Sequence, residues 1–250
     1  MSFRPRLFRL SLFLGLSSII LAWPVPADAQ GLSVSLAEGG SLSGTTIQLI
    51  LLITVLSLAP GLAIMVTCFP FLVTVLSILR QAIGLQQSPP NMLIVSLALF
   101  LTYFVMEPVF SEAWTYGVAP LVSEEIEIEA AFPKIIAPFR VFMADRLDPE
   151  TFASMAALRP DVVDLTPSAD AELSVLIPSF LLSEISRAFQ IGFLIFLPFL
   201  IIDLVVAAIL MSMGMMMVPP AIVSLPFKLS FFVIADGWSL IASSLVRSYF

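Results

Sequence analysis

The chain has 250 residues, of which 59% are hydrophobic and 12% charged, and its mean hydropathy is +1.06. Soluble domains carry roughly 45–50% apolar and about 25% charged residues, so this composition predicts a membrane protein. Histidine is absent and cysteine occurs once, which excludes a Ser-His or Cys-His nucleophile, an internal disulfide and a thiolate metal cluster. The net charge of −7 disfavours a nucleic-acid partner.

The first 29 residues have the features of a secretory signal peptide. Three arginines open the chain, a short apolar run covers 10–22, and 27–29 has the small-x-small pattern of a cleavage site. The run is shorter than the roughly 20 residues that a membrane span needs, which disfavours the alternative of an uncleaved first helix. We therefore expect cleavage after Ala29 and a mature N-terminus on the periplasmic side of a bacterial inner membrane.

Four apolar stretches follow a predicted flexible linker over 30–46. We expect them to be helical and to cross the membrane four times, with a loop around Arg80 between the first two. Prolines and glycines interrupt them, and lipid tolerates such breaks only where neighbouring protein or water satisfies the freed backbone groups. The prediction is an all-α fold of broken hairpins, one over 47–110 and one over 173–250, packed in a multi-subunit ring. The stretches are 47–66, 92–106, 173–210 and 227–246.

Between the hairpins, residues 111–172 hold a large share of the charged side chains, most of them acidic. We expect a small acidic periplasmic domain there, with its carboxylates on a solvated face. The run Glu124–Glu129 is predicted as an exposed helix or edge strand. Residues 132–159 are predicted to be helical, with an interruption at Asp148 and Pro149.

A methionine-rich loop is expected inside the second hairpin. Methionine side chains are unbranched and adaptable, so such loops from several subunits could form a deformable apolar constriction. On composition alone, core filling or lipid contact is the favoured alternative. The residues are Met211, Met213, Met215, Met216 and Met217.

Five ionisable residues lie in the last two apolar stretches: Glu184, Arg187, Asp203, Lys228 and Asp236. Such residues usually face a bundle interior and find a partner there. Structural ion pairs within or between subunits, an ion relay and catalysis are the three interpretations, and ion pairs are favoured. No phosphate-binding loop of the Walker type is present, and we predict no enzymatic activity and no cofactor.

Several blocks of sequence resemble the FliP family of flagellar biosynthetic proteins, components of the type III secretion export gate. The strongest covers 188–206 and leads into the methionine run, and others cover 79–91, 98–102, 223–229 and 235–238.

The resemblance implies about five copies that form a helical funnel with FliQ and FliR, through which unfolded flagellar subunits cross the inner membrane at the flagellar basal body. It also implies that the methionine loop is the gasket of the channel, and that Glu184 and Lys228 form an intersubunit ion pair. The alternatives are the related export-gate subunit of a virulence injectisome, and an ion-coupled small-solute transporter with Asp203 and Asp236 as midplane carboxylates.

Overall fold

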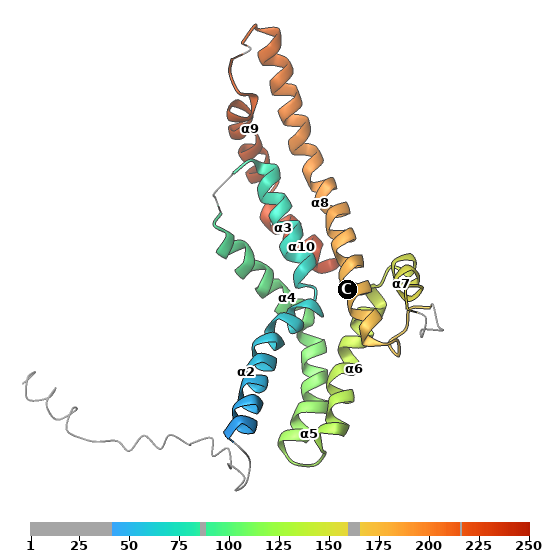
Figure 1. Cartoon of the computed structure of the whole chain (residues 1–250). Coiled ribbons are helices and arrows are strands. Elements are labelled where there is room, and N and C mark those ends of the chain that lie inside the picture. Colours follow the sequence, from blue (N-terminus) through green and yellow to red (C-terminus); the bar gives the residue numbers. More distant parts are fainter. Residues whose placement is uncertain (1–41, 86–88, 160–165, 216) are drawn as a thin grey trace, which may run out of the picture. The chain divides into compact units, whose positions relative to one another are not determined.

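The computed structural model describes residues 42–85, 89–159, 166–215 and 217–250, which are helical apart from their connecting turns (Figure 1). No strand occurs in this described part, so the all-α prediction is confirmed. Residues 55–250 pack as one unit. The elements are α2 (Leu42–Met65), α3 (Phe69–Ile83), α4 (Asn91–Ala113), the π-helix η1 (Trp114–Val118), α5 (Ala119–Val122), α6 (Ile128–Arg146), α7 (Pro149–Ala156), α8 (Leu173–Ser212), α9 (Pro220–Ile234) and α10 (Gly237–Arg247).

Within the described ranges, three apolar helical segments are long enough to cross a membrane: Thr46–Met65, Asn91–Val122 and Leu173–Ser212. The last stretch, predicted as one helix over 227–246, is instead the pair α9 and α10, which is bent by 60°. This pair counts as a fourth crossing if it is one broken span. The length and apolar character of these helices therefore allow three or four crossings.

The N-terminal predictions lie largely outside the described residues. The signal peptide, the cleavage site after Ala29 and most of the predicted linker belong to this undescribed part. Helix α2 begins at Leu42, a few residues inside the segment that the sequence assigned to the linker.

Helix α3 is the central element of the described unit, although the sequence predicted a loop around Arg80. It lies alongside α8 and also contacts α4 and α9 (Figure 1). Its 15 residues are too few for a membrane span, which is why a search for span-length stretches overlooked it. Its buried side chains recur at helical spacing and form one wide apolar face. They are Phe71, Leu72, Val75, Leu76, Leu79, Ala82 and Ile83.

The two helices approach closely at Gly192 in α8. A Cβ atom at this position would lie 2.4 Å from Cδ1 of Ile78 in α3 and 3.1 Å from its Cγ2. A side chain at this position would push the Ile78 side chain away, so Gly192 permits the close approach of the two helices.

Not every proline or glycine in the apolar stretches interrupts a helix as expected, because Pro60, Gly192, Pro198 and Pro226 lie inside continuous helices. A proline removes one hydrogen bond and bends a helix, but the turns on either side can continue. The chain changes direction where residues adopt positive φ instead: it reverses after Gly214 (φ 75°) and bends at Asp236 (φ 46°).

The acidic segment 111–172 does not pack as a separate unit. Its first part extends α4 through η1 and α5, and α6 returns against α4 and α8, while α7 packs on α8. The Arg140 guanidinium donates hydrogen bonds to the carbonyls of Ala169 (3.0 Å) and Ala171 (2.7 Å), which fastens the end of the segment to α6. The segment is therefore part of the helical body.

The structure contradicts the prediction for the acidic run and confirms the predicted interruption at Asp148. The run Glu124–Glu129 is a turn that leads into the start of α6, not a strand or a helix of its own, and Glu124 has φ 59°. The interruption at Asp148 is confirmed, because α6 ends at Arg146 and α7 begins at Pro149. The Thr151 hydroxyl and backbone N–H donate to the Asp148 carboxylate and lower its pKa, as expected for a charged N-cap.

The close approach at Gly192 gives a direct prediction. Gly192→Ala is expected to lower the free energy of unfolding by about 1–3 kcal/mol, because the new methyl group overlaps Ile78. Adding Ile78→Val, which removes Cδ1, is expected to restore part of the loss. Thermal unfolding in one detergent measures the effect. Gly61→Ala is the matched control, because no atom lies within 4 Å of its added Cβ; an equal loss there would contradict the packing argument.

Candidate functional site

The methionine residues lie at the tip of the α8–α9 hairpin, at the top of Figure 1. Met211 is in the last turn of α8, Met213 and Met215 flank Gly214, and Met217 precedes α9; Met216 lies outside the described residues. The side chains of Met213 and Met217 are 63% and 97% exposed. The four described methionines of the loop are exposed and do not pack in the interior of this chain.

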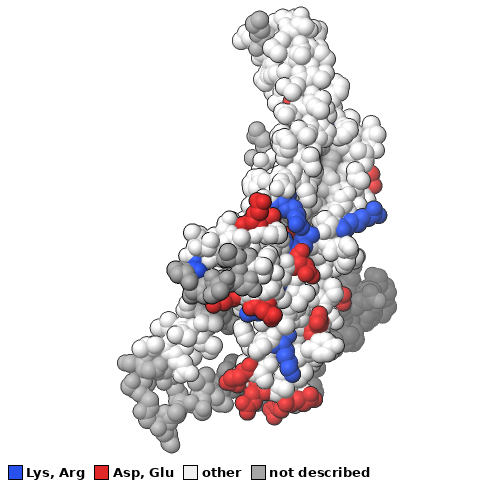
Figure 2. Space-filling view, turned by 90° about the vertical axis from the view of Figure 1, so that its right-hand side faces the viewer, with Lys and Arg blue, Asp and Glu red and all other residues white. Residues whose placement is uncertain are grey.

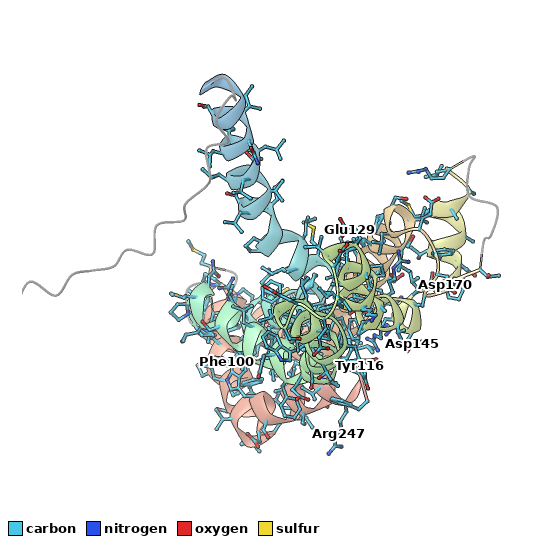
Figure 3. All side chains as sticks on the ribbon, turned by 90° about the horizontal axis from the view of Figure 1, so that it is seen from below. Phe100, Tyr116, Glu129, Asp145, Asp170 and Arg247 are labelled. Atoms are coloured by element: carbon cyan, nitrogen blue, oxygen red, sulfur yellow. The ribbon has the colours of Figure 1, made fainter. Side chains whose placement is uncertain are left out.

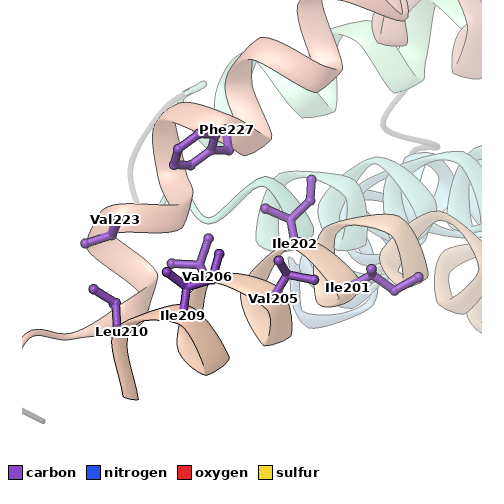
Figure 4. Close-up of a pocket in the computed structure, with 8 residues that line it drawn as sticks. All are labelled: Ile201, Ile202, Val205, Val206, Ile209, Leu210, Val223 and Phe227. Carbon is purple, nitrogen blue, oxygen red and sulfur yellow. The ribbon is translucent and has the colours of Figure 1, made fainter. Parts of the chain in front are cut away.

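An open apolar groove of about 400 Å³ lies between α8 and α9 below this tip (Figure 4). No polar side chain lines it, and the α8 wall consists of branched aliphatic residues. The groove continues the apolar surface of the loop along the hairpin. Its lining residues are Ile201, Ile202, Val205, Val206, Ile209, Leu210, Val223 and Phe227.

A buried ion pair joins three helices beside the groove. Lys228 of α9 is 5% exposed, and its Nζ atom lies 2.6 Å from Oδ2 of Asp203 in α8. Lys228 also donates to the Ala82 carbonyl (3.2 Å) in the last turn of α3, where unpaired carbonyls favour a cation. The Ser224 hydroxyl donates to Oδ1 of Asp203 at 2.5 Å. Both carboxylate oxygens of Asp203 are thus engaged by α9, and the Lys228 ammonium group connects α9 to α8 and α3.

A second charged cluster lies at the other end of α8. The fully buried Glu184 carboxylate accepts hydrogen bonds from Nε of Arg146 in α6 (3.3 Å) and from the Tyr249 hydroxyl. Burial raises the pKa of Tyr249, so its hydroxyl stays protonated and donates. The Arg146 guanidinium stacks 4.0 Å from the centre of the Tyr249 ring and donates to the Ser248 carbonyl at 2.6 Å.

The five ionisable residues that we selected from the sequence therefore do not form one site. Glu184 and Lys228, for which the resemblance implied an intersubunit pair, each have other partners within the chain. Their pairing between copies stays a prediction that a single chain does not test. Arg187 is half-buried on α8 and acts electrostatically on Asp148, and Asp236 is exposed at the bend between α9 and α10.

Charged and apolar surfaces are separated along the unit. In Figure 2 the Lys, Arg, Asp and Glu side chains gather on the lower part of the visible face, while the α8–α9 hairpin above is almost uncoloured. From below, Phe100 of α4 lies on the side opposite Asp145 and Asp170 (Figure 3). Phe100 is one of many exposed large apolar residues on α4 and α8. These helices therefore present apolar side chains to lipid or to neighbouring protein.

Sequence reasoning missed Arg146, Ser224 and Tyr249. Arg146 is 38 residues and Tyr249 is 65 residues from Glu184, so no local pattern connects them. Ser224 could have been found, because it precedes Lys228 by one helical turn on an otherwise apolar helix, and polar residues at that spacing share a face. Among the described residues, no group of three or more potential metal ligands gathers.

Span-length apolar helices with paired internal charges define a helical membrane protein. Comparison with known proteins narrows this class. A model described as the FliP family matches residues 52–245. The chain is 49% identical to the flagellar biosynthetic protein FliP of Caulobacter vibrioides, over 90% of this chain and 85% of that protein.

Two further proteins with the name flagellar biosynthetic protein FliP are also similar to this chain. The protein of Agrobacterium fabrum is 48% identical over 95% of this chain and 98% of its own length, and that of Bacillus subtilis is 46% identical over 82% and 92%. The chain therefore belongs to the FliP family, a family of flagellar biosynthetic membrane proteins.

The Asp203–Lys228 bridge predicts unequal effects of neutral substitutions. Asp203→Asn is expected to lower the free energy of unfolding by about 3 kcal/mol, because it leaves the Lys228 ammonium buried without a counter-charge. Lys228→Met is expected to cost less, since the Asp203 side chain is 32% exposed and keeps Ser224 as a donor.

The double variant Asp203→Asn with Lys228→Met is the control. It is expected to be more stable than Asp203→Asn alone, because no uncompensated charge remains. Thermal unfolding of the four proteins in one detergent measures this coupling. Strictly additive losses would mean that the two charges do not stabilise each other.

Proposed function

We propose that this chain is a channel-forming subunit of the flagellar type III export gate, in which the methionine loop closes the channel. The observation that carries the proposal is the exposed apolar tip of the α8–α9 hairpin in a member of the FliP family. A constriction of flexible thioether side chains excludes water and ions because it offers them no polar partner. The same side chains can repack around an unfolded polypeptide.

The proposed assembly contains about five copies of this chain together with FliQ and FliR. Isolated hairpins with exposed Met213, Met217 and Phe227 leave an apolar surface that a neighbouring subunit can cover. The buried Lys228 and Glu184 are neutralised within the chain, so a neighbour need not supply a counter-charge. Assembly would then be driven mainly by apolar packing and by closure of the ring.

The proposed location is the bacterial inner membrane at the flagellar basal body, with the mature N-terminus and the acidic segment on the periplasmic side. The predicted signal peptide supports this orientation. The injectisome alternative has less support, because the relatives named above are flagellar proteins. The transporter alternative also has less support, because the Asp203 carboxylate is already engaged by Lys228 and Ser224.

A conductance experiment tests the seal. Replacing Met213, Met215, Met216 and Met217 together by alanine is expected to raise ion leakage through membranes that contain the assembled gate, because the apolar volume at the constriction falls. The same four residues replaced by leucine are the control and are expected to stay nearly tight. Unchanged leakage in an alanine variant that still assembles would rule out the seal.

The subunit composition tests the assembly separately. Native mass spectrometry in mild detergent is expected to find a particle several times heavier than the 27.2 kDa chain, with FliQ and FliR present. A solitary chain that supports flagellar export would overturn the proposal.

A further inference from the structure

Residues 248–250, the short segment that follows α10, contact several other helices. The Tyr249 ring lies between two phenylalanines, with ring centres 5.6 Å from Phe71 of α3 and 6.0 Å from Phe142 of α6. Its hydroxyl donates to Glu184 of α8, and the Ser248 carbonyl accepts from Arg146. Two adjacent residues therefore connect three helices that are distant in sequence.

The segment is held mainly by these side-chain contacts. Leu245 anchors α10 in the core, and the remaining backbone bonds of the segment are local turn bonds from Ser248 to Ser244, from Tyr249 to Val246 and from Phe250 to Arg247. Phe250 is 79% exposed and adds little. Loss of the Tyr249 ring and hydroxyl contacts, together with the bond from Arg146 to the Ser248 carbonyl, would therefore free residues 248–250 while Leu245 keeps α10 in the core.

The closed arrangement also has an internal cost. Among the described residues, Nη2 of Arg146 is one of two buried side-chain polar atoms without a hydrogen-bond partner. A buried unpaired donor costs about 1–3 kcal/mol, and water that entered the cluster would satisfy it. This unpaired donor therefore offsets part of the free energy that the closed contacts contribute.

We propose that Ser248 and Tyr249 form a latch that opens locally over the buried Arg146–Glu184 pair, without unfolding of the surrounding helices. In the closed state the latch fixes the end of α6 to α3 and α8. In the open state water reaches the Arg146–Glu184 pair, while α6 stays packed against α8 through Met143 and the Phe142–Phe180 ring contact. The latch is thus a conformational device separate from the methionine loop.

The chain contains its own reporter of this opening. Cys68 is the one cysteine of the sequence, is fully buried one turn before Phe71, and is close enough to the Tyr249 hydroxyl, Arg146 and Glu184 to interact electrostatically with them. Burial raises the pKa of the Cys68 thiol to about 12, so the closed state is protected both sterically and by protonation. Reaction with a maleimide therefore requires opening.

The experiment measures the rate of maleimide labelling of Cys68 in the full-length chain, within its native complex in mild detergent. Tyr249→Phe keeps the ring but loses the hydrogen bond to a buried charge, and is expected to raise the rate about tenfold. Tyr249→Ala also empties the slot between the phenylalanines and is expected to raise it roughly a hundredfold. Phe250→Ala is the matched control and is expected to leave the rate unchanged.

Two results would overturn the latch. One is a Tyr249→Ala variant that keeps its helicity and unfolding temperature but labels at the wild-type rate. The other concerns the wild-type chain and applies even if that variant fails to fold. Local opening predicts a labelling rate that is nearly constant at low denaturant, because little surface is exposed. A rate that rises steeply from zero denaturant would mean that Cys68 is reached only by global unfolding.

Discussion

Charges buried in an apolar helical body must find partners on other helices, and this constraint organises the whole unit. Lys228 can lie inside because α8 supplies a carboxylate and the end of α3 supplies a carbonyl. Glu184 can be fully buried because α6 and the segment after α10 both donate to it. Each cluster joins three elements, so together they define how the second hairpin meets the rest of the unit.

The space between these clusters is filled by α3. Its wide apolar face packs along α8, and Gly192 leaves room there for the Ile78 side chain. This core positions the α8–α9 hairpin, whose tip has almost no packing of its own. A packed base therefore supports an exposed apolar tip, which is what the proposed seal requires.

The two ends of α8 thus differ in chemistry. The methionine tip is wholly apolar and exposed, and its proposed role depends on neighbouring copies. The end near Glu184 is charged, enclosed and closed by Tyr249 within one chain. If both ends move during the proposed export, they respond to different forces. The tip would respond to displacement by an apolar passenger, and the latch to hydration of the unpaired Nη2 atom of Arg146.

The sequence by itself determined the helical class, the apolar stretches, the interruption at Asp148 and the family, because composition, local turn chemistry and contiguous motifs are properties of short segments. Only the tertiary structure decided that α3 is central, that Lys228 pairs with Asp203, and that Tyr249 closes over Glu184. These contacts join residues far apart in the chain, and their energies depend on burial that no local pattern encodes. The bend at Asp236 was missed for the same reason, since the Phe232 ring packs where a side chain at Gly237 would lie.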